Sequence, residues 1–278
     1  MSLPSLPEVE AAIGQLPALP TIILEVLRVI DSGEAEMLAL DRLISNDQGL
    51  ASRILRIANS PFYGMSSHID TIKDACVLLG VHTLRHLTLA CGVISRFPPG
   101  KEGGFDRLQL WRHAVGVGIA ARVLAERCHV DADQAFTAGL LHDIGKLALD
   151  TCFPAQYAQV LSHRDSADCS LRAAELAVLG FDHSEVGVQL GKRWHLPDNI
   201  CAAIGGHHNP DRDAPMALVD LVHIADLVCR GLEIGDGGDS VMPPLSEPAL
   251  GRLGLSWEML GAAFPEIERM NAASNLLD

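Results

Sequence analysis

The stretch Ala138-Gly-Leu-Leu-His-Asp-Ile-Gly-Lys-Leu147 contains the one His-Asp pair in the chain. An imidazole and a carboxylate both offer lone pairs to a divalent metal ion. Residues three and four apart are neighbours on a helix, so Lys146 is expected on the same side as His142 and Asp143. An ammonium group beside metal ligands suits a phosphate. The stretch therefore indicates a metal site that accepts a phosphate group.

The same stretch contains two glycines, Gly139 and Gly145, within a helix that the pattern predicts over about 132–150. A glycine inside a helix costs roughly 1 kcal/mol relative to alanine. We expect this cost to be offset by a close approach of another backbone or of a ligand at these two positions.

Helix signals dominate the rest of the chain, and strand signals are nearly absent. Of the 278 residues, 48% are hydrophobic and only 4% are aromatic, so the core must consist mostly of aliphatic side chains. The sequence predicts an all-α, multi-helix bundle of HD type with an N-terminal helical lobe. Two stretches rich in glycine and proline, at 97–104 and 235–244, are predicted to be exposed linkers. They divide the chain into a lobe (1–98), a core that holds the metal site (104–234) and a helical tail (245–278).

Charge and cysteine content exclude several classes of protein. A net charge of −14 disfavours a nucleic-acid partner and an acidic membrane surface. The seven cysteines are scattered and form no CxxC motif, which predicts reduced thiols in a cytoplasmic protein. The most apolar stretch, 77–97, is interrupted by histidine and arginine and is not predicted to span a membrane.

Further candidate metal ligands lie at predicted helical positions outside the His-Asp pair. Helical bundles build metal sites in their cores from one or two side chains on each facing helix. The candidates are His113, His183, His207, His208 and Asp226. His223 lies one turn before Asp226 and is an alternative to it. Mixed histidine and carboxylate ligation suits iron, manganese, zinc or nickel better than calcium, so we expect one or two divalent transition metal ions.

Taken in chain order together with the His142-Asp143 pair, these candidates resemble the ligand set of the HD superfamily of metal-dependent phosphohydrolases. The wider pattern is similar to the HDOD branch, the HD-related output domains, over about residues 13–230. The segments that carry this resemblance are Leu16-Pro-Ala-Leu-Pro20, Ser45-Asn-Asp47 through Ala58-Asn-Ser-Pro-Phe-Tyr-Gly64, and Trp194-His-Leu-Pro197 with the following His-His pair. The turn at 59–64 is expected to determine the local fold.

The resemblance implies an all-α fold, a role in bacterial signal transduction and no generally assigned reaction. Carried over residue by residue, it implies one metal position at His113, His142, Asp143 and Asp226. A second position would consist of His183, His207 and His208, with Asp143 bridging the two. Asp143 and Lys146 would be the catalytic residues of any phosphohydrolase activity, with Lys146 against the phosphate.

The chain departs from its relatives in two respects. Many HDOD domains have lost metal ligands, whereas this sequence keeps the full set. The related HD-GYP phosphodiesterases carry a Gly-Tyr-Pro motif, but His207-His208 is followed here by Asn-Pro-Asp-Arg, which argues against cyclic di-GMP hydrolysis.

Three functions are therefore open. The first is a signalling output domain whose bound metal, or a small phosphorylated ligand, controls contact with a signalling protein. The second is a metal-dependent phosphohydrolase acting on a nucleotide or cyclic dinucleotide. The third is a metal-free interaction scaffold. The complete ligand set favours the first two, and the absence of the Gly-Tyr-Pro motif favours the first, so enzymatic turnover stays an open question.

Overall fold

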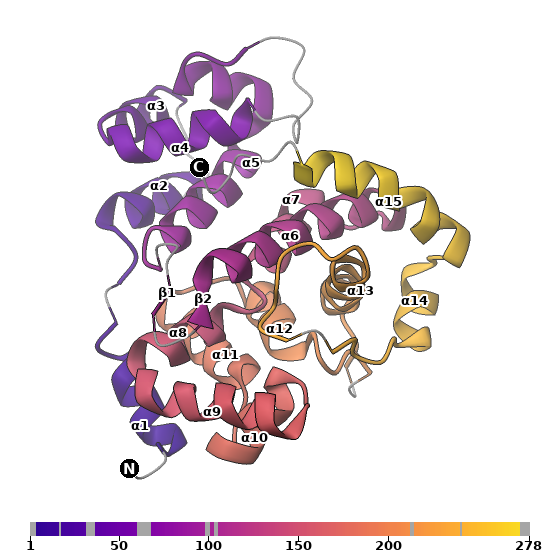
Figure 1. Ribbon diagram of the computed structural model, residues 1–278. Helices are drawn as coiled ribbons and strands as arrows, with labels where there is room; N and C mark the ends of the chain where they lie inside the picture. The colour runs from indigo at the N-terminus through magenta and orange to yellow at the C-terminus, as the bar shows by residue number, and fades with distance from the viewer. Residues whose placement is uncertain are drawn as a thin grey trace. The chain divides into compact units, whose positions relative to one another are not determined.

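A computed structural model describes residues 4–16, 18–31, 37–59, 68–97, 101–102, 105–211, 214–239 and 241–272, and helices dominate these segments (Figure 1). The one sheet among these residues is an antiparallel ribbon of β1 (Lys101–Glu102) and β2 (Phe105–Asp106). The all-α class predicted from the sequence is confirmed.

The chain forms two compact units. The larger unit comprises Met1–Ala18 and Pro99–Pro265, and the smaller unit comprises Leu19–Pro98 and Glu266–Asp278. The helices of the smaller unit are α2 (Thr21–Asp31), α3 (Met37–Ser45), α4 (Gln48–Ala58) and α5 (Ile72–Ile94). Those of the larger unit are α1 (Leu6–Ile13), α6 (Arg107–Cys128), α7 (Ala132–Leu141), α8 (Ile144–Cys152), α9 (Pro154–Ala167), α10 (Leu171–Leu179), α11 (His183–Arg193), α12 (Asp198–Gly206), α13 (Ala217–Gly231), α14 (Glu247–Leu253) and the first part of α15 (Trp257–Ala272). The predicted division at residues 98, 104, 234 and 245 stays a prediction.

In the smaller unit, α5 packs against α2, α3 and α4. By length and composition α5 could cross a membrane, but 56% of its most apolar window is buried, as is common for a core helix of a globular lobe. Gly80 interrupts it with φ 79°, at the position where the sequence predicts a helix stop. Asp47 caps α4 and Thr71 caps α5, each by accepting a hydrogen bond from a free backbone N–H of the first turn.

The turn after α4 is held by Asn59. Its side-chain amide donates to the carbonyl oxygens of Leu55 (2.9 Å) and Ile69 (2.7 Å), and its Oδ1 accepts from the Ile69 N–H (2.7 Å). One side chain thus links the end of α4 to Ile69, shortly before α5. Ser60–Gly64 lies outside the described residues, as do the predicted helix stop at Ser32-Gly33 and the residues 98–100 of the first linker.

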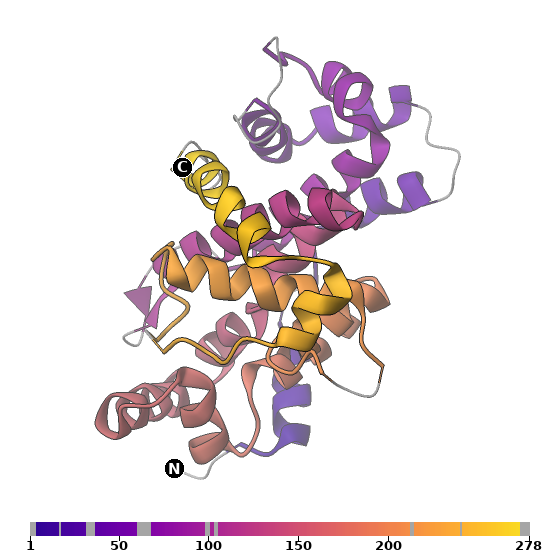
Figure 2. The ribbon, with the colours of Figure 1, turned by 90° about the vertical axis from the view of Figure 1, so that its right-hand side faces the viewer.

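The larger unit is built around α13, which is buried on nearly all sides. A helix that is apolar all round belongs in the centre of a bundle, and α13 packs against α6, α7, α12 and α14 (Figures 1 and 2). The helices α6 and α7 lie side by side, and Gly139 allows this: a Cβ there would lie 2.7 Å from the Val117 carbonyl oxygen. The expected close backbone approach is confirmed at this position.

Two predictions about this unit are wrong in detail. The single helix predicted over about 132–150 breaks at His142 and Asp143, which form a turn between α7 and α8. The broken helix turns the two side chains into the bundle while their neighbours stay in helices. The sequence also predicts a helix from Asp168 to Gly180 because aspartate and glycine are common helix ends, but α10 begins only at Leu171, and α9 before it was not predicted.

The glycine-rich segment 235–244 was predicted to be an exposed linker, and residues 235, 236, 241, 242 and 244 are exposed as predicted. The prediction is wrong for Gly237 and Gly238, which are buried in a strap (234–239) across the bundle. Polar groups in the protein hold it in place. Lys146 donates to the Gly237 carbonyl oxygen (2.7 Å), and Asp239 accepts from the Leu171 N–H (2.8 Å). Gly235 allows the strap to pack closely against α6. Its φ is +66°, and a Cβ on it would lie 2.2 Å from the backbone nitrogen of His113.

Candidate metal centre

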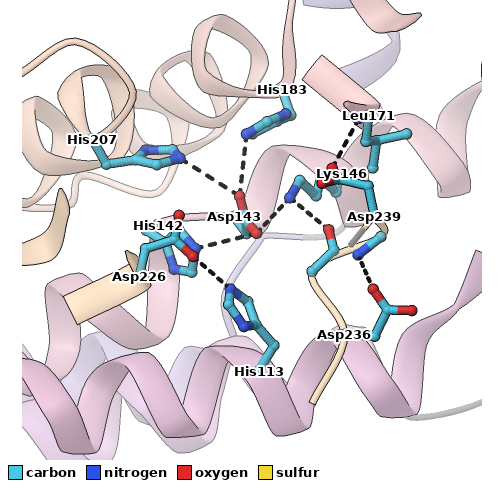
Figure 3. A network of polar contacts seen from close by, with 12 residues as sticks. His113, His142, Asp143, Lys146, Leu171, His183, His207, Asp226, Asp236 and Asp239 are labelled. Carbon is cyan, nitrogen blue, oxygen red and sulfur yellow. Dashed lines mark hydrogen bonds and ion pairs between the residues drawn. The ribbon is translucent and has the colours of Figure 1, made fainter. Parts of the chain in front are cut away.

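All seven predicted ligands lie in the larger unit. Figure 3 shows six of them, all but His208, with their side chains pointing toward one another. They come from α6, from the turn between α7 and α8, from the first residue of α11, from the end of α12 and from α13. Their ligand atoms form two groups, within each of which all atoms lie within 4.8 Å of one another. The first group is His113, His142 and Asp226, and the second is Asp143, His183, His207 and His208.

Asp143 lies between the two groups because its two oxygens face different histidines. Its Oδ1 lies 3.1 Å from His183 Nε2 and 3.7 Å from His207 Nε2. Its Oδ2 lies 3.2 Å from His142 Nε2, which belongs to the first group. In the first group, His113 Nε2 lies 2.9 Å from Asp226 Oδ1. One carboxylate can therefore serve both groups.

The histidine rings are oriented by their other nitrogen. His142 Nδ1 lies 2.7 Å from the Gly139 carbonyl oxygen, and His207 Nδ1 lies 2.8 Å from the Ile204 carbonyl oxygen. His183 Nδ1 lies 2.6 Å from Glu175 Oε2. An acceptor at Nδ1 places the ring proton there and leaves Nε2 as the free lone pair, as is usual for histidines that bind metals.

The inward-facing atoms lack hydrogen-bond partners although they are buried. Among the described residues these atoms include the Nε2 atoms of His113, His142 and His207 and the Oδ1 of Asp143. Buried polar atoms are rarely left without a partner unless an ion or water satisfies them. His183 Nε2 and His208 Nε2 are 2.9 Å apart, close to the roughly 3 Å between two nitrogens that bind one ion at about 2.1 Å each and at right angles, as in octahedral coordination. The residues therefore fit divalent metal ions.

The charge states also favour metal binding. Burial alone would raise the pKa of Asp143, but His142 and Lys146 hold it well below its usual value. Burial likewise opposes ionisation of Asp226, and Arg230 and His113 hold its pKa well below the usual range. Both carboxylates are thus anionic at neutral pH, as metal ligands must be.

Two histidines of the second group are neutral, and one is not. Burial and the neighbouring His142 lower the pKa of His207 to about 3, and burial with His207 lowers that of His208 well below its usual value. Burial lowers the pKa of His183 too, but the Glu175 carboxylate outweighs it and raises the pKa to about 9. Without metal, His183 is protonated at neutral pH, and an ion must displace that proton.

Lys146 lies next to Asp143, as the spacing predicted. Its ammonium group is buried and donates to Asp143 Oδ2 (2.6 Å) and to the Gly237 carbonyl oxygen (2.7 Å). The same lysine thus fixes the shared carboxylate and the strap. Its predicted role at a phosphate stays a prediction.

Sequence reasoning missed two charged residues that support the ligands. Glu175 is fully buried and accepts from His183 at both its backbone N–H (2.9 Å) and its ring. Arg230 donates to Asp226 Oδ1 (3.1 Å) one helical turn earlier. Both lie in helices that consist mostly of apolar residues, which was the available signal. His223, the alternative to Asp226, is outside both groups: its Nδ1 contacts the His207 carbonyl oxygen and its Nε2 accepts from the Ser246 N–H.

Comparisons with known proteins agree with this arrangement. The model of the HDOD domain family matches residues 16–210. An HDOD domain protein of unknown function from Geobacter sulfurreducens has a similar crystal structure, with TM-score 0.81, 26% identity, and coverage of 98% of this chain and 99% of that one. A candidate phosphohydrolase from Shewanella amazonensis is also similar, with TM-score 0.77, 26% identity, and coverage of 97% and 98%.

The sequence is also similar to ribonuclease Y of Lactobacillus gasseri, with 28% identity over 68% of this chain and 29% of that protein. This chain spans less than half the length of the curated relatives it matches.

Proposed function

The chain belongs to the HDOD domain family, and we propose that it is a metal-dependent hydrolase of phosphate esters. The observation that carries the proposal is the position of Asp143, whose two oxygens face two separate groups of ligand atoms. A carboxylate shared by two ion positions is typical of sites that cleave phosphate esters with two metal ions. The similarity to a candidate phosphohydrolase gives further support.

Within the proposed site, His113, His142 and Asp226 would hold one ion, and His183, His207 and His208 the other, with Asp143 shared. Bound divalent ions would supply Lewis acidity toward the ester and an acidic water. The protein contributes orientation. Lys146 keeps Asp143 turned toward both groups, and Glu175 keeps His183 Nε2 directed inward.

The acidic chain makes a small ester a better substrate than a nucleic acid. Ribonuclease Y is named for action on RNA, a phosphodiester. A net charge of −14 repels a polyanion and leaves a single phosphate group tolerable.

The test compares charge-neutral variants in each group. His113→Gln and His207→Gln each remove one donor without leaving a new buried charge, and His163→Gln on α9 is the control outside the centre. We expect the wild type to bind one or two equivalents of transition metal by elemental analysis. After reloading with manganese, iron, zinc or nickel, it should cleave p-nitrophenyl phosphate or bis-p-nitrophenyl phosphate. Metal content and cleavage should fall in both group variants and persist in the control. Wild-type protein that holds metal but cleaves neither ester refutes hydrolysis of these ester classes.

A second candidate function is a signalling output domain in which metal binding controls a partner contact. One observation favours it: His223 links the carbonyl oxygen of His207 (2.8 Å) to the N–H of Ser246 (3.2 Å), which caps α14. Movement of His207 on metal binding would reach α14 along this path. Metal-dependent hydrogen exchange in α14, together with an absence of ester cleavage, supports this candidate over hydrolysis. If the protein binds no metal under any loading condition, both of these functions are refuted and the metal-free interaction scaffold is the remaining hypothesis.

A further inference from the structure

A pocket of about 210 Å³ adjoins the second ligand group, where His183 and His208 line one side of it. The charged side chains around it are mostly cationic, in contrast to the net charge of −14 on the chain. They are Lys146, Arg172, Arg230 and Asp239. Such a pocket attracts an anion that the rest of the surface repels.

Two of the three cations each bond to several groups inside the protein, and both are largely buried. Lys146 holds Asp143 and the strap, as described above. Arg230 donates to Asp226 Oδ1 (3.1 Å), Asp239 Oδ1 (3.1 Å) and the Val241 carbonyl oxygen (3.2 Å). Both support the walls of the pocket.

Arg172 differs from the other two cations. Its Nε donates to Asp182 Oδ2 (2.6 Å), while its two terminal nitrogens donate to none of the described residues. The side chain is 40% exposed. Asp182 also accepts from the Ser184 N–H (2.9 Å) and so caps the helix that begins with His183. Asp182 therefore fixes the guanidinium group of Arg172 relative to the start of α11, where the metal ligand His183 lies.

Four consecutive residues that line the pocket are apolar: Val241, Met242, Pro243 and Pro244. The side chains of Val241 and Met242 are 40% and 52% exposed, so a ligand can contact them. A pocket lined by both cations and apolar side chains suits a ligand that has an anionic group and an organic group. The volume lies below the roughly 300–1,000 Å³ of pockets for drug-sized ligands, so the ligand is small.

We propose that this pocket binds the substrate, a small organic phosphate of mononucleotide size or less, and that Arg172 is its specificity-determining residue. The phosphate accepts hydrogen bonds from the terminal nitrogens of Arg172 beside His183 and His208, and the organic group lies against Val241 and Met242. That the bound phosphate is a substrate rests on the proposed hydrolase function, whereas its binding in the pocket does not.

The test measures binding by calorimetry, with adenosine 5′-monophosphate (AMP) and inorganic phosphate as probes, on protein as purified and on protein loaded with Mn²⁺. The variants are Arg172→Ala and Val241→Ser. The matched control is Arg122→Ala, which removes a half-buried arginine paired with Asp133 away from the pocket. Loss of a charge-assisted hydrogen bond should weaken the binding of both probes by about tenfold or more in Arg172→Ala. Val241→Ser should weaken AMP binding and leave phosphate binding unchanged, and Arg122→Ala should leave both unchanged.

Wild-type protein that binds neither probe overturns the inference, as does equal binding by wild type and a folded Arg172→Ala variant. If Arg172→Ala does not fold or loses its metal, the test depends on Val241→Ser instead. Unchanged AMP binding by the Val241→Ser variant then overturns the inference. Binding without cleavage keeps the pocket and refutes the hydrolase. If esters are cleaved, Arg172→Ala should raise KM for p-nitrophenyl phosphate more than it lowers kcat, and an unchanged KM refutes the pocket alone.

Discussion

Replacing Gly145 with alanine tests whether the metal centre requires direct contact between α8 and α11. A Cβ on Gly145 would lie 1.9 Å from the His183 carbonyl oxygen and 2.7 Å from the Gly187 nitrogen. These are backbone atoms, which cannot rotate away as a side chain can. To reach 3.0 Å, below which real Cβ contacts essentially never occur, the two helices must separate by 3.0 − 1.9 = 1.1 Å.

That displacement acts on the ligands directly, because Asp143 precedes α8 and His183 begins α11, and their facing atoms are only 3.1 Å apart. Overpacking of this kind typically costs 1–3 kcal/mol, against a gain of roughly 1 kcal/mol from replacing a helical glycine. We expect the free energy of unfolding to fall by up to about 2 kcal/mol and the metal of the second group to be lost.

The assay is urea unfolding together with elemental analysis. Gly251→Ala on α14 is the matched control, because no atom lies within 4 Å of its Cβ position. We expect it to keep its metal and to be neutral or stabilised by up to about 1 kcal/mol. If Gly145→Ala retains both metal content and stability, the contact between α8 and α11 does not position the ligands, and this reasoning is refuted.

Three further predictions follow from other contacts. In metal-free protein the pKa of His183 is raised to about 9, so its contribution to stability is full below its unfolded pKa of about 6.5 and is lost as the pH rises through 9. Urea unfolding across this window should show a loss on the order of 3 kcal/mol, with a smaller slope in Glu175→Gln; a flat profile contradicts the assignment. Asp143→Ala should cost about 3–5 kcal/mol, because it leaves the Lys146 ammonium buried and unpaired. The double variant with Lys146→Met should recover much of that loss, and failure to recover it would mean that the charge is not the cause. Asn59→Ala should lower stability by about 1–3 kcal/mol and leave the metal content unchanged, so loss of metal would contradict a purely local role.

Local signals with a direct physical cause were sufficient to predict much of the fold. Asp47 and Asp182 act as helix caps because their carboxylates accept from backbone N–H groups that a helix leaves free. The two glycines of the central stretch lie where α7 and α8 touch other backbones. Histidine and aspartate in apolar helices indicated the centre, and all seven candidates converge there.

What the sequence did not indicate depends on contacts between distant segments. The turn at His142 and Asp143 reads as helix because its residues have no strong stop signal. The strap reads as a linker by composition, yet Lys146, 91 positions away, bonds to Gly237 and keeps it buried. Glu175 looks like a surface residue until His183 lies beside it. Local sequence patterns do not predict contacts between residues this far apart in the chain.

The way the chain divides between the two units limits how the protein can be cut or recombined. It begins in the larger unit with α1, passes through the smaller unit, returns at Pro99 and leaves again within α15. There α1 packs against α8 and α11, and Arg193 donates to the Leu16 carbonyl oxygen (3.0 Å). A gene fragment that starts at residue 99 would therefore encode a bundle without one of its own helices. The two units are interleaved along the chain, so a single crossover within 19–98 would combine α1 of one homologue with the rest of the larger unit of another.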